Sequence, residues 1–205
     1  LESADDTGAS QLDNVTIGDP TQGDGILDFV VTAEAGAAVV VKDGNTVIDT
    51  FLSSGTDTRT LTLAEGTHLL STEVTDTAGN ISAQAEELVV EVDFTDPAAS
   101  TLALAPTSDT GTPGDNITSL AQPAFVGLAE ANAHIRVYAN GVLVGEGTVN
   151  SDESDGDPTD GLGVWEVTVE PLADGEYVIE TEVEDLAGNI SALSQALTIT
   201  VDSGA

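Results

Sequence analysis

One seven-residue segment occurs twice in this chain of 205 residues and limits what the chain can fold into. It reads Asp-Thr-Ala-Gly-Asn-Ile-Ser at 76–82 and Asp-Leu-Ala-Gly-Asn-Ile-Ser at 185–191, a spacing of 109 positions (185 − 76). Two more pairs keep that spacing: Val92-Asp93 with Val201-Asp202, and Ala64-Glu65-Gly66 with Ala173-Asp174-Gly175. Similarity at one fixed period indicates a repeat architecture. The chain is therefore one unit written twice, and we place two domains at 1–95 and 96–205.

Apolar and polar residues alternate along most of the chain, and the 3.6-residue period of a helix is nearly absent. His134-Ile-Arg-Val-Tyr138 and Val164-Trp-Glu-Val-Thr-Val169 each place apolar side chains on one face. Short stretches rich in Val, Ile and Thr, bounded by Gly, Asp and Asn, are typical of strands. In the second domain we expect strands at Ser100–Ala105, Ala124–Ala129, His134–Tyr138, Val142–Thr148, Val164–Glu170, Tyr177–Glu184 and Ala192–Val201.

Seven short strands in about 100 residues favour a two-sheet sandwich of immunoglobulin type. The first domain shows the same order from about Gln11 to Val92. The predicted fold is all-β, with two tandem seven-stranded immunoglobulin-like antiparallel β-sandwiches. The segment Asp93-Phe-Thr-Asp-Pro97 joins them as a short acidic linker. We expect it to be stiff, because Pro97 ends strand pairing and holds Asp96 in an extended form.

Charge is the extreme feature of the composition. Three Lys and Arg stand against 37 Asp and Glu, which gives a formal net charge of −34. Such a surface repels phosphates and anionic lipid, so nucleic acid is excluded as a partner. No apolar run approaches the roughly 18 residues of a membrane span, and we expect no direct membrane insertion. Because like charges destabilise a compact chain, we expect bound cations to be part of the folded form.

The chain contains no methionine, so Leu1 is not a natural start. We therefore expect a fragment of a longer protein, with any signal peptide outside it.

Three sequence features together resemble a known family. They are the repeated Asp-Xaa-Ala-Gly-Asn-Ile-Ser segment, the linker at 92–97, and Ser108-Asp-Thr-Gly-Thr-Pro-Gly-Asp-Asn-Ile-Thr118. They are similar to the tandem bacterial immunoglobulin-like repeats that form the extender region of giant repeats-in-toxin-type and biofilm-associated surface adhesins. The resemblance implies a secreted, extracellular stalk on the bacterial cell surface that projects a terminal ligand-binding domain for adhesion or biofilm formation. It also implies Ca²⁺ at domain junctions and neighbouring repeats of the same chain as partners. We expect a monomer.

Candidate calcium ligands follow from the loop positions in such a sandwich. A junction would join the pole where the last strand of the first domain exits to the pole where the first strand of the second domain enters. Ca²⁺ takes six to eight oxygen ligands from carboxylates, amides and carbonyls. The side chains expected at the junction are Asp24, Glu65, Asp93, Asp96, Glu130, Asn132, Asp185 and Asn189.

Two further partial sites are expected at the outer ends of the pair. Asp76 and Asn80 lie at the entry pole of the first domain. Carboxylates and one amide gather at the exit pole of the second domain: Asp109, Asp115, Asn116 and Asp202, with Asp174 nearby. A metal-free interpretation stays open for all these turns, because Asp and Asn in turns most often hydrogen-bond their own backbone. Such a turn would explain Asn189 equally well.

The second domain also carries an acidic insert at 151–160. Its alternate acids Glu153, Asp155 and Asp157 are similar to the start of an EF-hand loop. However, Pro158 stands where the turn glycine should follow, and no Glu closes the loop at its twelfth position. A solvated loop is therefore favoured over a local cation site.

Catalysis finds little support in the sequence. His68 and His134 lie in different domains, and nucleophile motifs, glycine-rich phosphate loops and Cys/His zinc spacings are all absent. We expect no enzyme. The alternative function is a carbohydrate- or protein-binding immunoglobulin-like module that uses the insert and Trp165, although the alternation around Trp165 favours a core position. An appendage of a glycan-cleaving enzyme would share the fold.

Overall fold

The computed structural model describes residues 15–16 and 25–204. The chain divides into unit 1, Leu1–Thr95, and unit 2, Asp96–Ala205. Within the described part of the chain, no helix is long and apolar enough to cross a membrane.

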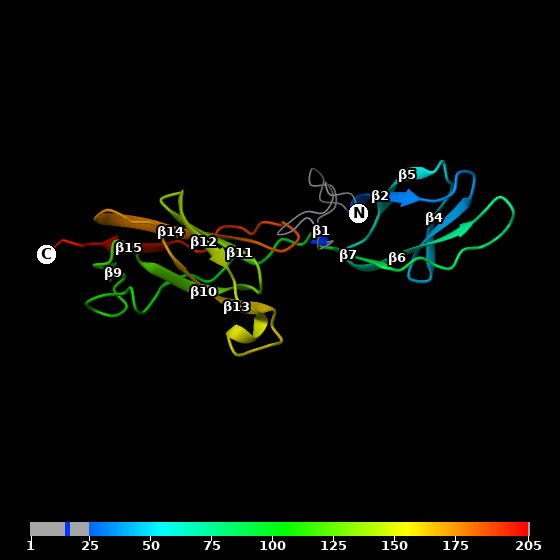
Figure 1. Ribbon diagram of the computed structural model, residues 1–205. Coiled ribbons are helices and arrows are strands. Elements are labelled where there is room, and N and C mark those ends of the chain that lie inside the picture. Colours follow the sequence, from blue (N-terminus) through cyan, green and yellow to red (C-terminus); the bar gives the residue numbers. More distant parts are fainter. Residues whose placement is uncertain (1–14, 17–24, 205) are drawn as a thin grey trace. The chain divides into compact units, whose positions relative to one another are not determined.

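Unit 1 is a sandwich of two sheets (Figure 1). Its strands are β1 (Val15–Thr16), β2 (Ile26–Thr32), β3 (Ala38–Asp43), β4 (Thr46–Leu52), β5 (Thr56–Thr62), β6 (Gly66–Thr75) and β7 (Leu88–Val92). One sheet has the order β1-β7-β6-β3-β4, and among the described residues the other consists of β2 and β5.

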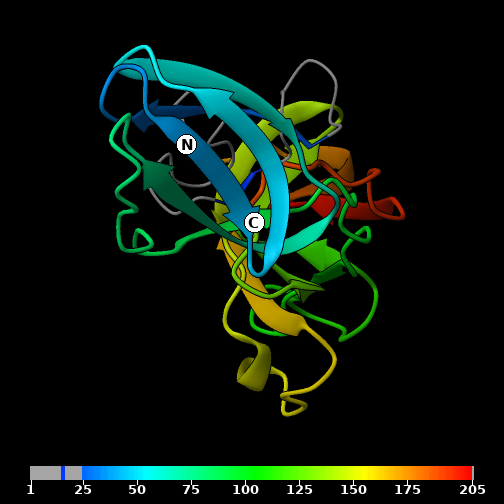
Figure 2. The same cartoon turned by 90° about the vertical axis from the view of Figure 1, so that its right-hand side faces the viewer.

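Unit 2 has the same architecture. Its elements are β8 (Ala103–Leu104), β9 (Ile117–Thr118), β10 (Ala124–Glu130), β11 (His134–Ala139), β12 (Val142–Thr148), the 3₁₀ turn η1 (Asp152–Ser154), β13 (Leu162–Thr168), β14 (Gly175–Glu184) and β15 (Leu197–Val201). The sheets have the orders β12-β11-β14-β15-β9 and β13-β10-β8. The insert with η1 forms the yellow loop that stands away from the strands of unit 2 in both views (Figure 1 and Figure 2).

The two units repeat each other in strand order and in register. The β2–β5 ladder pairs Ile26 through Thr32 with Thr62 through Thr56, and the β10–β13 ladder pairs Ala124 through Glu130 with Thr168 through Leu162. Position 27 in unit 1 therefore corresponds to 125 in unit 2, and 59 corresponds to 165. The β6–β7 and β14–β15 ladders match at the 109-residue spacing. The all-β, immunoglobulin-like fold predicted from the sequence is confirmed.

Two of the predicted strands are shorter than expected, and two short pairs run parallel. Only Ala103–Leu104 of the stretch 100–105 forms a ladder with β10, and the last strand begins at Leu197 rather than Ala192. Over 191–196, serine hydroxyls replace backbone carbonyls as ladder acceptors. Ser191 Oγ accepts from the Val183 amide at 3.0 Å, and Ser194 Oγ accepts from the Thr181 amide at 3.0 Å. The parallel pairs are β1 with β7 and β9 with β15.

Trp165 lies in the centre of the unit 2 core, with none of its surface exposed. Its partner across the β10–β13 ladder is Gly127. A Cβ atom at position 127 would lie 2.8 Å from Trp165 Nε1 and 1.9 Å from the carbonyl oxygen of Thr101. The indole and the backbone of Thr101 thus occupy the space that a side chain at 127 would need. This burial confirms the core position that the alternation predicted for Trp165.

We expect Gly127→Ala to destabilise unit 2 by about 1–3 kcal/mol, because the new methyl group overpacks this contact. Urea unfolding followed by the fluorescence of Trp165, the only tryptophan of the chain, measures the change. The control is Glu166→Ala at the neighbouring exposed position, for which we expect a change within about 0.5 kcal/mol. Equal midpoints for the two variants would contradict the assigned packing.

Candidate functional site

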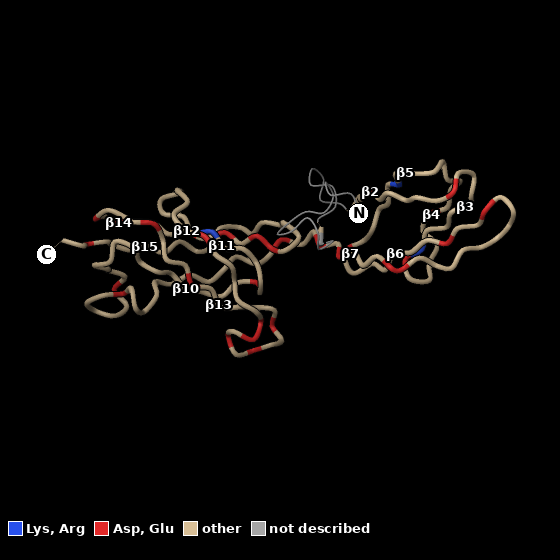
Figure 3. Tube along the Cα trace, in the orientation of Figure 1, with Lys and Arg blue, Asp and Glu red and all other residues tan. Residues whose placement is uncertain are grey.

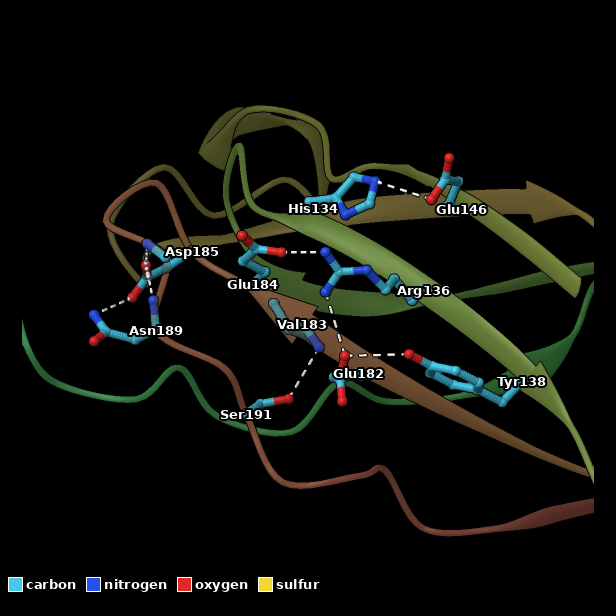
Figure 4. A network of polar contacts seen from close by, with 11 residues as sticks. His134, Arg136, Tyr138, Glu146, Glu182, Val183, Glu184, Asp185, Asn189 and Ser191 are labelled. Atoms are coloured by element: carbon cyan, nitrogen blue, oxygen red, sulfur yellow. Dashed lines mark hydrogen bonds and ion pairs between the residues drawn. The ribbon is translucent and has the colours of Figure 1, made fainter. Parts of the chain in front are cut away.

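The repeated turn in unit 2 is closed by its own aspartate (Figure 4). Asp185 Oδ1 accepts hydrogen bonds from the backbone amides of Gly188 at 2.7 Å and Asn189 at 2.9 Å. Asp185 Oδ2 accepts from the side-chain amide of Asn189 at 2.8 Å. Gly188 has a φ of +102°, a left-handed value that glycine adopts without steric cost. The aspartate, glycine and asparagine of the motif therefore each have a local structural role.

The copy in unit 1 is closed in a similar way, with Ala78 in place of the counterpart of Gly188 as one of the two backbone donors. Asp76 Oδ1 accepts from the amides of Ala78 at 2.9 Å and Asn80 at 2.8 Å, and Oδ2 accepts from the Asn80 side chain at 2.7 Å. The side-chain amide of Asn80, followed by its backbone N–H, holds the pKa of Asp76 below its ordinary value. The copies differ in burial: Asp185 is 3% exposed and Asn189 8%, whereas Asp76 is half-buried and Asn80 is exposed.

These bonds are the ones that the metal-free interpretation of the turn requires. They do not exhaust the carboxylate, because an ionised carboxylate has about four acceptor positions. Three are used at Asp185 by the bonds given above. Calcium ligation by Asp185 and Asn189 therefore stays a prediction, as it does for Asp76 and Asn80.

Two predicted ligands of unit 1 converge on one threonine. Asp93 Oδ1 accepts from the Thr95 amide at 3.0 Å, and both carboxylate oxygens of Glu65 lie 2.9 Å from Thr95 Oγ1. The carboxylates of Glu65 and Asp93 are thus held next to the same residue at the end of unit 1. Asp96 is exposed, and Asp24 lies outside the described residues.

Glu130 and Asn132 lie in the tight turn between β10 and β11. The Ala133 amide donates to the Glu130 carbonyl at 3.3 Å. Asn132 has a φ of +66°, in the left-handed region that Asn tolerates better than most residues. The backbone alone therefore explains the asparagine, and its role as a ligand stays a prediction.

At the other end of unit 2, the loop 109–116 is held by its own acids. Asp109 Oδ2 accepts from the Gly114 amide, and Asp115 Oδ1 accepts from the Ile117 amide at 3.0 Å. Asp109 Oδ1 is buried and accepts no hydrogen bond from the described residues. Such an oxygen suits a hard cation chemically. Asn116 has a φ of +57°, and its carbonyl accepts from Thr200, so this loop lies beside the strand that leads to Asp202.

No preformed cluster accompanies that oxygen. Over residues 15–16 and 25–204, no three His, Asp or Glu side chains are grouped so that they could hold a metal ion. Single donors fit Ca²⁺, but within this part of the chain they are not assembled into a coordination shell.

The acidic insert is organised by hydrogen bonds from carboxylates to nearby backbone amides. Asp155 Oδ1 accepts from the Asp157 amide at 2.9 Å, Asp157 Oδ1 from Thr159 at 3.2 Å, and Asp160 Oδ1 from Leu162 at 2.9 Å. Successive turns of this kind agree with the interpretation of a solvated loop.

All three basic residues of the chain are already in ion pairs. Lys42 Nζ lies 3.1 Å from Glu73, Arg59 Nε lies 2.8 Å from Asp49, and Arg136 contacts both Glu182 and Glu184. Figure 3 shows these few blue positions among many red ones. The remaining carboxylates consequently have no basic side chain available to neutralise them.

Arg136 belongs to a polar network on the outer face of β11 and β14 (Figure 4). The Tyr138 hydroxyl donates to Glu182 Oε1 at 3.2 Å, and Arg136 Nη1 lies 3.3 Å from the same oxygen. Burial, and then the charge of Glu182, raises the pKa of the Tyr138 hydroxyl. These contacts join two neighbouring strands, so their evident role is to stabilise the sheet.

His68 is fixed between two acceptors. Its Nδ1 lies 2.7 Å from Asp43 Oδ2, and its Nε2 lies 2.8 Å from the Ala64 carbonyl. Burial lowers the pKa of His68, but the hydrogen bonds to Asp43 and Ala64 outweigh it and raise the pKa overall. The bond to His68 in turn lowers the pKa of Asp43. Both ring nitrogens of His68 are thus engaged by neighbouring acceptors within unit 1.

The chain matches the model of a bacterial Ig-like domain over residues 1–94 and again over 96–203. It belongs to the bacterial Ig-like domain family. A comparison with curated protein sequences finds no match.

Several solved structures resemble this tandem of bacterial Ig-like domains. The fibronectin(III)-like modules of Clostridium thermocellum CbhA share 16% identity over 85% of both chains, with a TM-score of 0.43. A tetra-tandem repeat in the extending region of a large adhesion protein shares 17% identity, with a TM-score of 0.39, and the match covers 97% of this chain and 48% of that one. SGBP-B of the Bacteroides ovatus mixed-linkage glucan utilization locus, in complex with a heptasaccharide, shares 16% identity over 84% of this chain and 40% of that one, with a TM-score of 0.27. At these identities the likeness concerns the fold alone.

We expect the two copies of the repeated turn to contribute differently to the free energy of unfolding. In Asp185→Ala the buried amide of Asn189 and the partly buried amide of Gly188 lose their acceptor, which we expect to cost about 1–3 kcal/mol of unfolding free energy. In Asp76→Ala water can replace the carboxylate, so we expect a smaller loss. Residue-resolved amide exchange in each unit measures both, and a larger effect in unit 1 would contradict the difference in burial.

The Asp43–His68 pair should stabilise unit 1 only within a pH window. The raised pKa of His68 gives a contribution that is complete below the ordinary value of 6.5 and is lost as pH rises through the raised value. The lowered pKa of Asp43 gives a second contribution to stability, which is present above pH 3.8 and is lost as pH falls through the lowered pKa. We expect His68→Gln to cost up to about 1 kcal/mol at about pH 5.5 and less at about pH 8.5.

Amide exchange in unit 1 at both pH values measures this difference. In an Asp43→Asn background the pH dependence of the His68→Gln effect should become smaller, because only the Ala64 carbonyl and the charge of Glu91 then still raise the pKa of His68. An undiminished pH dependence in this background would contradict the role assigned to Asp43.

Proposed function

We propose that the two units are non-catalytic extender repeats of a large bacterial surface adhesin, of the repeats-in-toxin or biofilm-associated type. The observation that carries this proposal is the duplication itself: two units with the same strand order and ladder register follow each other with only a short acidic segment between them. Repeating one module is how a chain gains length without a new fold at each step. Such a stalk works outside the cell and presents a terminal domain.

The surface chemistry supports a spacer better than a binding module. Aromatic residues make up 3% of the chain, and Trp165, the largest of them, is fully buried. Sugar binding and protein hot spots draw mainly on exposed Trp and Tyr. Domains with Ig-like and fibronectin-like folds are in general non-catalytic. The alternative function, recognition of a carbohydrate or protein by the insert and Trp165, loses its aromatic platform.

The proposal includes Ca²⁺ as a stiffening ion. It rests on the sequence resemblance, on the net charge of −34, and on the fact that every basic side chain is already paired. A divalent cation that binds the folded state of such a chain offsets like-charge repulsion and is linked to stability. The predicted ligands near the linker, Asp93 and Asp185 foremost, are the residues to test.

We expect Ca²⁺ to raise the unfolding free energy by about 2.7 kcal/mol at a concentration 100 times its dissociation constant. Thermal unfolding in Ca²⁺ and in EDTA at equal ionic strength measures this, with Mg²⁺ as the control for general screening. Small-angle scattering under the same conditions measures whether the particle becomes longer and stiffer. Identical melting and identical scattering with and without Ca²⁺ would refute the calcium part of the proposal.

A pair of matched double variants locates the ion. Asp93→Asn with Asp185→Asn should reduce the Ca²⁺-dependent rise, whereas Asp155→Asn with Asp157→Asn should leave it unchanged. Both variants remove two negative charges and alter side-chain volume little, so the difference isolates position from charge. Equal losses in the two variants would indicate diffuse counterion binding.

A further inference from the structure

In unit 2, one extended segment links the two sheets along the edge of β10. This leading segment comprises residues 97–105. The Thr101 amide donates to the Leu128 carbonyl at 2.9 Å, and Thr101 Oγ1 accepts from the Leu128 amide at 2.7 Å. One residue earlier, Ser100 Oγ lies 2.5 Å from Thr181 Oγ1 on β14, in the opposite sheet. Leu102 packs against the core that the two sheets enclose.

Unit 1 has an apolar cavity at the corresponding place. Its volume is about 150 Å³, and it opens between β2 and β5 on one side and β6 with the segment 85–88 on the other. Thr72 in its wall corresponds to Thr181, and Val30 corresponds to Leu128. The principal residues that line it are Phe29, Val31, Leu70, Thr72, Ala85 and Leu88.

Burial differs between the two units at these matched positions. Thr181 is fully buried and Ser194 is 6% exposed, whereas their counterparts Thr72 and Ala85 are half-buried and exposed. One backbone hydrogen bond is common to both units: the Ser194 amide donates to the Thr181 carbonyl at 2.9 Å, and the Ala85 amide donates to the Thr72 carbonyl at 3.0 Å. The Ser194 hydroxyl, which accepts from the Thr181 amide, has no counterpart at Ala85. With this backbone bond kept, the difference in burial reflects what covers these residues.

We propose that the cavity of unit 1 is the binding site of an additional extended strand whose side chains resemble those of the leading segment. The strand places a small hydroxyl residue against Thr72 and a branched aliphatic side chain in the cavity. An apolar cavity of about 150 Å³ holds a molecule of the size of benzene, so it has room for one leucine side chain. The added strand extends the β2 side of the sandwich by strand addition. Its source is a segment joined to unit 1 in the same chain, because in unit 2 the occupant is part of the unit that it covers.

The path of this strand in unit 1 must differ from that of residues 97–105 at one point. Phe29 occupies the ladder position of Gly127, where a Cβ atom would lie 1.9 Å from the Thr101 carbonyl oxygen. Atoms in contact need about 3 Å or more, so the strand lies farther from β2 at that residue. The Phe29 ring then forms the base of this binding site.

The test attaches Asp-Pro-Ala-Ala-Ser-Thr-Leu-Ala, the sequence of residues 96–103, directly before Leu1 of the full chain. This junction continues the leading segment in register, because Leu1 and Asp6-Thr-Gly8 match Leu104 and Asp109-Thr-Gly111 at one spacing. We expect the melting temperature of unit 1 to rise by about 4 °C or more. We also expect the Ala85 amide to exchange about tenfold more slowly, towards the rate of its counterpart at Ser194. The Trp165 fluorescence transition of unit 2 should not move.

The matched control carries Asp in place of Leu at the seventh position of the attached sequence and should produce neither change. An equal rise with this control, or no rise with the parent extension, would overturn the proposal. Dimers that form only with the extension would show that the attached strand binds the cavity of a second copy, which would overturn the proposal that the strand comes from the same chain. All arms are run in EDTA, so the result is independent of the calcium proposal.

Discussion

Repulsion between carboxylates is the constraint on which the rest of this structure depends. The chain carries a net charge of −34, and its three cationic side chains are each already held by neighbouring acids. Many of the acids instead accept hydrogen bonds from backbone amides, as at Asp76, Asp185 and Asp174. Hydrogen bonds to ionised groups are stronger than neutral ones and organise the loops. They leave the charge in place, however, so repulsion between like charges still opposes the compact state.

The same constraint explains why the repeated motif resists a single interpretation. Asp-Xaa-Ala-Gly-Asn-Ile-Ser builds a similar turn in both units. In each, the aspartate accepts from two backbone amides and from the asparagine side chain, although one of the two amide donors differs. A turn that satisfies its own carboxylate is stable without metal, and an acidic turn with one acceptor position remaining is also suited to a cation. The geometry of the turn alone therefore does not distinguish the two roles. Burial does differ between the copies, so a shared motif has not produced equal environments.

Much of the fold could be predicted from the sequence because alternation and turn residues act locally. The alternation around His134 and Val142 predicted β11 and β12 to within one residue of their observed ends. The parts that could not be predicted depend on partners distant in sequence. The stretch 100–105 alternates like a strand, yet only Ala103–Leu104 forms a regular ladder with β10. At Thr101 the side-chain hydroxyl accepts from the β10 backbone, and at Ser100 the chain contacts Thr181 on β14. The proposed ion ligands come from separate loops, and no local pattern states which loops meet.

The two cores show how one register can hold different interiors. Across the ladder, unit 2 pairs Gly127 with Trp165, and unit 1 pairs Phe29 with Arg59. Residues directly opposite in a ladder share one patch of the inner face, so each unit supplies one aromatic ring there, from opposite strands. The glycine of unit 2 lets the Thr101 backbone approach β10 closely. In unit 1, Arg59 contacts Asp49 and the Phe51 ring on β4 of the other sheet, at 2.8 Å and at 4.6 Å from the ring centre, and Phe29 fills the interior. The aromatic ring comes from β13 in unit 2 and from β2 in unit 1, while the pairing of the two strands stays the same. This exchange alters how closely a further strand can approach β10 or β2.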